Sequence, residues 1–359
     1  MMFGKNFSVK VFGASHAAQI GCVVRGCPKG TKISTKEIQK DLERRRPGAN
    51  LLTTQRKEPD KMIVKNGIVA GAANGKPIKL VIVNKDVDSR PYQKFSGKPR
   101  PGHADYTAYV KYGQGFDMRG GGIFSGRMTA PLVMAGGIAK QMLKNNGIAI
   151  GACLAQVGRA KMAKEITQAN IRQVPVEGIF CPDKKTALEM KKEVEKARAQ
   201  KDSVGGIIEC RCFGVPSGLG DPMFGSVESI ISSAVFGIPA VKGIEFGAGF
   251  AISGMKGSKS NDPFVMKGGK VATATNNAGG ILGGITNGMP IVFRVAFKPT
   301  ASIGKKQRTV DLKTMRNANI VVTGRHDPCL ALRAVPVVEA VAAICIADMA
   351  LAQKAQRKN

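Results

Sequence analysis

The stretch VPVVEAVAAICIADMALA, from Val335 to Ala352, is the most apolar part of the chain. It is about long enough to cross a bilayer, but Glu339 and Asp348 interrupt it. We therefore expect a buried helix of a globular protein and not a membrane span. Pro336 suits the first turn of such a helix, where no backbone N–H is needed, so the helix is predicted to run to about Lys354.

The rest of the chain mixes strand-like and helix-like patterns without regular β-α-β alternation. Ser34 and Glu37 have the spacing of a capping box for a helix that must end before Pro47. Further helices are predicted at 129–144, 185–200 and 226–236, and strands at 7–12, 20–25, 78–83, 148–157, 206–213 and 291–297.

Two other segments carry local signals. Asn66-Gly67, between 62–65 and 68–70, predicts a hairpin turn. Residues 85–127 show little regular pattern, and a long irregular stretch inside a compact protein is usually functional.

We expect one α+β domain over 1–359 with helices packed on antiparallel sheet, a core over about 7–350 and a basic tail at 353–359.

The composition limits the class of protein. The 359 residues include 55 Lys and Arg against 25 Asp and Glu, giving a formal charge of +30, and Trp is absent. The basic residues are spread along the whole chain and few aromatic residues accompany them, so a small polyanionic ligand is favoured over nucleic acid. None of the eight cysteines forms a CxxC pair, and no signal peptide opens the sequence, which indicates a reduced, cytoplasmic protein.

Three histidines exist, and each lies in a turn-like setting. They are His16, His103 and His326, each close to Gly or Pro. Acid–base work near neutral pH is one interpretation, and unrelated packing or surface histidines are the other. A metal site is less favoured, since no pair has helix spacing and no carboxylate cluster accompanies them.

Arginines strengthen the functional interpretation. Arginine binds carboxylate and phosphate groups in a bidentate manner, which suits a substrate with several negative groups. A solvated basic face is the alternative. A Gly-rich stretch at 279–288 lacks the P-loop pattern, but with Lys298-Pro299-Thr300-Ala301-Ser302 it could cradle a phosphate. The arginines in polar or Gly- and Pro-rich segments are Arg44, Arg45, Arg46, Arg100, Arg119, Arg127, Arg325 and Arg333.

Together these segments resemble chorismate synthase, in family order over nearly the whole chain. The matching motifs are Gly13-x-Ser15-His16, Asp41-Leu42-x-Arg44-Arg45-Arg46-Pro47-Gly48, Thr53-Thr54-Gln55-Arg56-x-Glu58-Pro59-Asp60, Arg100-Pro101-Gly102-His103-Ala104-Asp105-Tyr106, Arg119-Gly120-Gly121-Gly122, Ser125-Gly126-Arg127, Val241-Lys242-Gly243-Ile244-Glu245, Ala278-Gly279-Gly280-Ile281-Leu282-Gly283-Gly284-Ile285, Lys298-Pro299-Thr300, Gly324-Arg325-His326-Asp327-Pro328-Cys329 and Arg333-Ala334-Val335-Pro336.

The resemblance implies a fold and a reaction. The fold is a β-α-β sandwich, a helical layer between antiparallel sheets, assembled as a homotetramer. The reaction is the anti-1,4-elimination of phosphate from 5-enolpyruvylshikimate 3-phosphate to give chorismate. It requires reduced FMN without net redox change. Some members reduce the flavin with NADPH, and others depend on an external flavin reductase.

The resemblance also implies residue roles. His16 protonates the leaving phosphate, His103 lies by the reduced flavin, and Asp327 acts with the flavin in removing the C6 proton. The residues implied for substrate or NADPH are Ser15, Arg45, Arg46, Arg127 and Arg333. Those implied for FMN are Ser125, Gly283, Lys298, Pro299, Thr300, Ala301, Ser302 and Arg325.

Six positions depart from the family pattern, all on active-site loops. The family usually has a charged residue in place of four of them: Glu for Ala14, a basic residue for Leu51, Arg for Ile123 and Glu for Met128. It has Gly in place of Ala17 and a small residue in place of Phe124. These departures leave an alternative open, a divergent flavin-binding homologue with reduced or lost catalysis.

Overall fold

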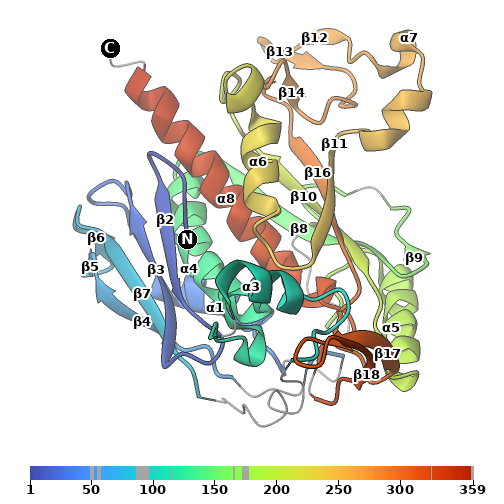
Figure 1. The fold of residues 1–359 in the computed structure, drawn as a ribbon. Helices are drawn as coiled ribbons and strands as arrows, with labels where there is room; N and C mark the ends of the chain where they lie inside the picture. Colours follow the sequence, from blue (N-terminus) through green and yellow to red (C-terminus); the bar gives the residue numbers. More distant parts are fainter. Residues whose placement is uncertain are drawn as a thin grey trace.

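The computed structural model describes residues 1–48, 52–54, 58–85, 97–113, 115–164, 166–171, 178–324 and 326–356. Within these residues the strands form two five-stranded sheets and four two-stranded ones, all with antiparallel neighbours. Figure 1 shows the two large sheets on opposite sides of a central pair of helices. The predicted sandwich, a helical layer between antiparallel sheets, is therefore the observed architecture.

The first sheet comes from the N-terminal part of the chain. Its strand order is β1-β2-β3-β7-β4. The apolar residues Val9 and Val11 of β2 and Ile20, Cys22 and Val24 of β3 are buried at every second position, so one face of the sheet lies against the helices. The strands are β1 (Met2–Phe3), β2 (Ser8–Gly13), β3 (Gln19–Arg25), β7 (Ile78–Val83) and β4 (Met62–Asn66).

The second sheet comes from the middle and C-terminal parts. Its order is β11-β16-β10-β8-β9, so β10 and β16 are central and mostly buried. The strands are β11 (Val241–Phe246), β16 (Ile291–Phe297), β10 (Gly206–Phe213), β8 (Ala149–Val157) and β9 (Ala160–Lys161). The short pairs are β5 (Ile68–Val69) with β6 (Ala72–Ala73), β12 (Phe264–Lys267) with β13 (Lys270–Thr273), β14 (Ile281–Leu282) with β15 (Ile285–Thr286), and β17 (Lys306–Asp311) with β18 (Arg316–Val321).

Helices α4 and α8 form the middle layer. They pack against each other; α4 also contacts β3, and α8 contacts β8 and β10. The helices are α1 (Thr35–Arg45), α3 (Asp105–Tyr112), α4 (Thr129–Lys144), α5 (Lys184–Ala199), α6 (Val227–Val235), α7 (Gly257–Ser260) and α8 (Ala331–Gln356), with 3-10 turns η1 (Arg119–Phe124), η2 (Gly126–Met128), η3 (Met223–Gly225) and η4 (Gly249–Gly254).

Helix α8 is the apolar helix expected from Val335–Ala352. Among the described residues it is the one helix long and apolar enough to cross a membrane, and 89% of its most apolar window is buried inside the protein. Both interrupting carboxylates have partners. Glu339 pairs with Arg44 and Lys140. Asp348 accepts the backbone N–H of Phe7 at 2.8 Å. The carboxylates thus connect the helix to other layers of the fold.

Two local predictions were wrong. The Asn66-Gly67 turn does not join a hairpin, because β4 pairs with β7 and β5 pairs with β6. Gly67 has φ +89°, and a Cβ there would lie 2.5 Å from the Cα of Ile78, so the glycine serves a close crossing over β7. Helix α8 begins at Ala331, so Pro336 lies beyond the first turn. Burial of Ala331 and Leu332 favours the extra turn.

The described parts of the stretch 85–127, namely 85, 97–113 and 115–127, are more regular than expected, since they contain α3, η1 and η2. Helix α3 buries only Ala108, so its sequence shows no apolar periodicity that could predict it.

Ser34 caps α1 as predicted and accepts the Glu37 N–H, whereas its own N–H donates to Gln141 at 2.6 Å and not to Glu37. All eight cysteines are free.

Candidate active site

A cavity of about 580 Å³ lies where the start of α8 meets several loops. The loops that line it include 100–104, 123–127, 236–242 and 298–302. The cavity gathers most of the residues singled out by the sequence: Arg45, His103, Ser125, Arg127, Lys298, Pro299, Thr300, Ala301, Ser302, Asp327 and Arg333.

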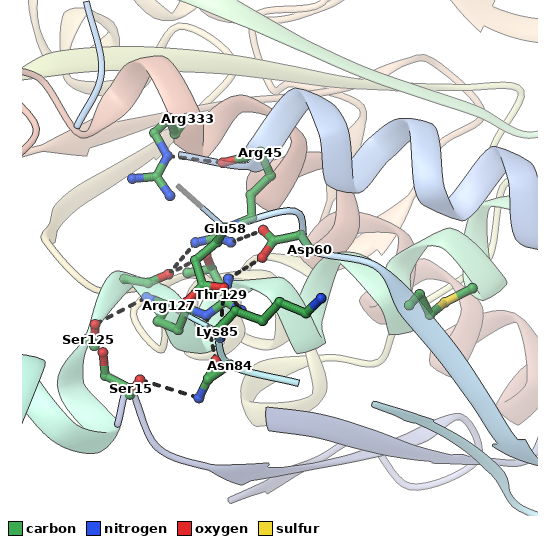
Figure 2. A network of polar contacts seen from close by, with 12 residues as sticks. Ser15, Arg45, Glu58, Asp60, Asn84, Lys85, Ser125, Arg127, Thr129 and Arg333 are labelled. Atoms are coloured by element: carbon green, nitrogen blue, oxygen red, sulfur yellow. Dashed lines mark hydrogen bonds and ion pairs between the residues drawn. The ribbon is translucent and has the colours of Figure 1, made fainter. Parts of the chain in front are cut away.

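Two arginines of the cavity share one buried carboxylate. Arg45 Nη1 lies 2.7 Å from Asp60 Oδ2, and Arg127 Nη1 binds the other oxygen, Oδ1. Figure 2 shows both guanidiniums converging on Asp60 from different elements. Thr129 accepts from Arg45 Nε at 3.1 Å, and Asn84 accepts from Arg127 Nε at 2.9 Å. The two side chains are therefore fixed in direction before any ligand binds.

Burial makes the charge balance of this cluster important. Asp60 is fully buried, and Arg45 and Arg127 are 2% and 4% exposed. Burial alone would raise the pKa of Asp60, but the two guanidinium charges outweigh it and hold the pKa below its usual value. Burial lowers the pKa of Arg45 to about 9, opposed by Asp60. Arg45 thus remains protonated at neutral pH, and two cations share Asp60 with the more distant Glu58, 3.7 Å from Arg127.

Asp327 and Arg333 form a second ion pair on the cavity. Arg333 Nη1 lies 2.6 Å from Asp327 Oδ2, and Arg333 Nε donates to the carbonyl of Arg45 at 3.0 Å. The backbone N–H of Thr54 donates to Asp327 Oδ1 at 2.9 Å. The end of α1 and the start of α8 are therefore joined at this point, and the carboxylate of Asp327 is oriented on both oxygens.

His103 is oriented by Asp105. Its Nδ1 lies 2.8 Å from Asp105 Oδ1 and 3.1 Å from Arg100 Nη2. A carboxylate accepts only, so Nδ1 carries the proton and donates to Asp105, which leaves Nε2 for a ligand. Burial would raise the pKa of Asp105, but bonds from Arg100 and His103 hold it well below its usual range. His103 therefore stands beside a permanent negative charge.

The loops 100–105 and 298–302 are bonded to each other. Arg100 Nη1 donates to Ser302 Oγ at 3.2 Å, and the ammonium of Lys298 donates to the carbonyl of Gly102. Thr300 Oγ1 is buried, and the structure gives it no partner within the described residues. The two predicted loops therefore form one wall of the cavity, with a hydroxyl available.

His16 and Ser15 lie next to the cavity. A Cβ on Gly120, which lines the cavity, would lie 2.6 Å from His16 Nε2 and 2.7 Å from Ser15 Oγ. The amide of Asn84 donates to the carbonyls of Ala14, Ser15 and Ala17, which fixes the loop. His16 thus packs directly behind Gly120.

Two further predicted residues of the described chain, Arg46 and Gly283, do not line the cavity. Arg46 borders a second, open cavity of about 1230 Å³ beside α1 and α4, and Arg333 borders both. Gly283 lies between β14 and β15 and does not line the cavity. Arg325 lies outside the described residues, as does Leu51. The departures Ile123 and Phe124 line the cavity.

Sequence reasoning missed several residues of the site. Glu58 and Asp60 were quoted only as part of a motif, and Asn84 was not singled out, although all three hold Arg127. The segment 236–240 lines the cavity and was also missed, whereas Val241 and Lys242 were quoted only as part of a motif. The chain has 25 Asp and Glu residues against 55 Lys and Arg, so each carboxylate is notable. The pair Glu58 and Asp60, shortly after Thr53-Thr54, was the pattern that could have indicated these carboxylates as site residues.

The wall of the cavity presents unpaired polar groups to a ligand. Three buried polar atoms on its wall lack hydrogen-bond partners within the described residues: Arg127 Nη2, Thr300 Oγ1 and His326 Nε2. Orphaned buried groups are costly and commonly mark a site that a ligand completes. A charged donor, a hydroxyl and an imidazole match a ligand with anionic and neutral polar parts.

These features define an enzyme site for a small ligand with several negative charges, held between two antiparallel sheets. Residues 7–351 match the family model described as chorismate synthase. The chorismate synthases of Pyrococcus abyssi and Thermococcus kodakarensis are 49% and 46% identical to the chain, covering 97% and 99% of it and 96% and 98% of their own lengths. A crystal structure of chorismate synthase aligns with a TM-score of 0.76 at 26% identity, covering 98% of this chain and 93% of that one.

The chain belongs to the chorismate synthase family. The matches confirm the predicted family, the sandwich fold and the enzyme class, a carbon–oxygen lyase acting on a phosphate. They do not favour the alternative of a divergent homologue with lost catalysis.

Proposed function

We propose that the protein eliminates phosphate from 5-enolpyruvylshikimate 3-phosphate to give chorismate, with reduced FMN present and no net redox change. The observation that carries the proposal is the pair of buried guanidiniums, Arg45 and Arg127, on Asp60, with Arg333 close by. The substrate bears two carboxylates and a phosphate. Prepositioned charged donors in a dry site bind such groups far more strongly than in water.

The arginines take the substrate's anionic groups. Arg127 offers Nη2, a buried donor without a hydrogen-bond partner in the described chain. Arg333 can exchange Asp327 for a substrate carboxylate, since both residues line the cavity. Their side chains are 11% and 10% exposed. Arg46 would act from the second cavity, which shares Arg333 with the first. Ser15 supplies a hydroxyl beside the Gly120 turn.

Two groups handle the protons of the elimination. The C3–O bond to phosphate and the C6–H bond both break, the ring double bond between these two carbons shifts, and the ring gains one further double bond. His16, behind Gly120, gives a proton to the leaving phosphate. Asp327, oriented by the Thr54 N–H, takes part in removing the C6 proton once Arg333 turns to the substrate.

The flavin would lie on the wall formed by the loops 100–105 and 298–302. When bound, reduced FMN supplies electron density that eases loss of the phosphate. His103, with Nε2 left for a ligand, would stabilise the negative charge of the reduced flavin. The residues proposed to hold FMN are Ser125, Lys298, Pro299, Thr300, Ala301 and Ser302, with Gly283 and Arg325 retained from the family pattern.

Reduced flavin would come from a separate flavin reductase. The cavity wall is apolar at Ile123 and Phe124, where Phe124 lies in an aromatic group with Tyr112 and Phe116. Neither Ile123 nor Phe124 offers a cation to the phosphates of NADPH. We further propose a homotetramer and a cytoplasmic location, both from the family pattern.

The proposed function is tested with purified protein, the substrate and FMN under anaerobic conditions. Photoreduced FMN should support phosphate release, while NADPH with oxidised FMN should not. His103→Ala should abolish turnover and leave the circular dichroism spectrum unchanged, and Tyr106→Phe on the same segment is the control. Absence of phosphate release at saturating reduced FMN would refute the activity.

A further inference from the structure

The third histidine, His326, is unlike the other two. It lines the cavity, and its Nε2 is buried with no hydrogen-bond partner in the described part of the chain. His103, by contrast, bonds to Asp105. An imidazole nitrogen that is sealed from water and left unpaired is costly, and a hydrogen bond to a ligand can recover that cost.

The ring of His326 is uncharged at neutral pH. Burial, and then the nearby guanidinium of Arg100, lower the pKa of His326 to about 4. A neutral imidazole offers a hydrogen bond and no net charge. It is therefore poorly suited to a phosphate or a carboxylate, which the neighbouring arginines already serve, and well suited to an uncharged polar group.

A second unpaired group has the same character. Thr300 Oγ1 is buried without a partner among the described residues and lines the same cavity. Arg100 connects the two, because it lies near His326 and belongs to the loop bonded to Ser302. His326 and Thr300 thus border the wall to which we assign FMN.

We propose that His326, through Nε2, hydrogen-bonds the uncharged part of bound FMN, with Thr300 as a neighbouring contact. This assignment rests on the proposed function. It gives the third histidine a binding role that is separate from the carboxylate of Asp327. A packing role alone does not explain why a residue that lines the cavity keeps a buried ring nitrogen without a partner in the described part of the chain.

Binding is measured by quenching of the fluorescence of oxidised FMN and of riboflavin. His326→Ala should weaken binding of FMN and of riboflavin by the same factor, about tenfold, because riboflavin lacks only the phosphate. His326→Gln should restore most of the affinity, since its amide nitrogen can occupy the place of Nε2, and His326→Asn should not. Gln307→Ala is the control, because Gln307 Nε2 is also buried and unpaired but lies off the cavity.

Each outcome decides between the proposals. If the wild-type protein binds neither flavin, the flavin site fails and this inference fails with it. If the wild type binds both and His326→Ala binds them equally well, only the role of His326 is refuted. Loss of FMN affinity with riboflavin affinity unchanged would assign His326 to the phosphate and overturn the inference. Equal loss for Ala and Gln, with unchanged thermal unfolding, would also overturn it.

Discussion

Arg45 and Asp60 form an ion pair of 2.7 Å in which both side chains are almost completely removed from solvent. Such a pair contributes little net stability, because desolvation offsets the attraction. Its value lies in geometry, since Asp60 also binds Arg127 and so sets the spacing of two guanidiniums. Asp60 is thus a positioning residue for the proposed substrate arginines.

Asp60→Asn should separate these two roles. Removing the charge leaves two buried cations without their main counter-charge, so the free energy of unfolding should fall by about 3–5 kcal/mol. Urea denaturation measures this loss. Among molecules that remain folded, KM for the substrate should rise more than kcat falls, because the arginines lose their direction.

The control for that experiment is Asp202→Asn. Asp202 pairs with Lys305 at 2.7 Å, but the two side chains are 35% and 47% exposed. An exposed pair is worth about 0–1 kcal/mol, so this variant should be nearly neutral. A loss at Asp60 no larger than the loss at Asp202 would contradict the positioning role.

Gly120→Ala tests the placement of His16. The new Cβ would meet His16 Nε2 at 2.6 Å, so the ring must move. Turnover should fall by about 100-fold, as a misplacement near 1 Å can cause. Gly30→Ala is a matched control, because Gly30 also has positive φ, +82°, but nothing lies within 4 Å of its Cβ position. It should lose about 1–2 kcal/mol of stability and keep its turnover per folded molecule.

Much of the fold could be predicted from local pattern. The predicted strands 78–83, 206–213 and 291–297 and the helix 129–144 coincide with β7, β10, β16 and α4. These elements are mostly buried; the strands show apolar runs or alternation, and the helix 129–144 is apolar on all sides. The β12–β13 and β17–β18 pairs were missed because most of their residues are exposed, so little apolar alternation marks them.

The site was predictable in its parts and not in its arrangement. The sequence motifs contain Arg45, Arg127 and His103, so these residues could be predicted as site residues. The contact between Asp60 and the two arginines could not, because it depends on how α1, the 58–60 segment and η2 converge in space. Adjacent Arg45 and Arg46 also face different cavities, which their shared motif could not indicate.

Glu339→Gln tests the charge network that ties α8 to its neighbours. Glu339 binds Arg44 through both oxygens at 2.8 Å and Lys140 at 2.7 Å, and it is 3% exposed. Breaking this network should lower the free energy of unfolding by about 3–5 kcal/mol at pH 7.

The same network predicts acid sensitivity. Burial would raise the pKa of Glu339, but Arg44 and Lys140 hold it well below its usual range. The unfolded chain binds the proton first, so this stability is present above pH 4.5 and is lost as the pH falls below it. Urea midpoints should therefore converge for wild type and Glu339→Gln at low pH, and a constant difference down to pH 2 would contradict the assignment.

His326 should show its effect in a higher pH window. Its pKa is lowered to about 4 in the folded protein, from an ordinary value of 6.5. As the pH falls from 6.5 towards 4, the unfolded chain takes up a proton that the folded chain does not, so the folded state loses stability. From pH 7 to pH 5 this loss is about 2 kcal/mol. His326→Gln lacks the titrating imidazole, so its free energy of unfolding should fall by about 2 kcal/mol less than that of the wild type between pH 7 and pH 5. The other titrating groups are common to both proteins and cancel in this comparison. Urea unfolding at pH 7, 6 and 5 measures the difference, and parallel curves for the two proteins would mean that His326 is protonated freely in the folded state.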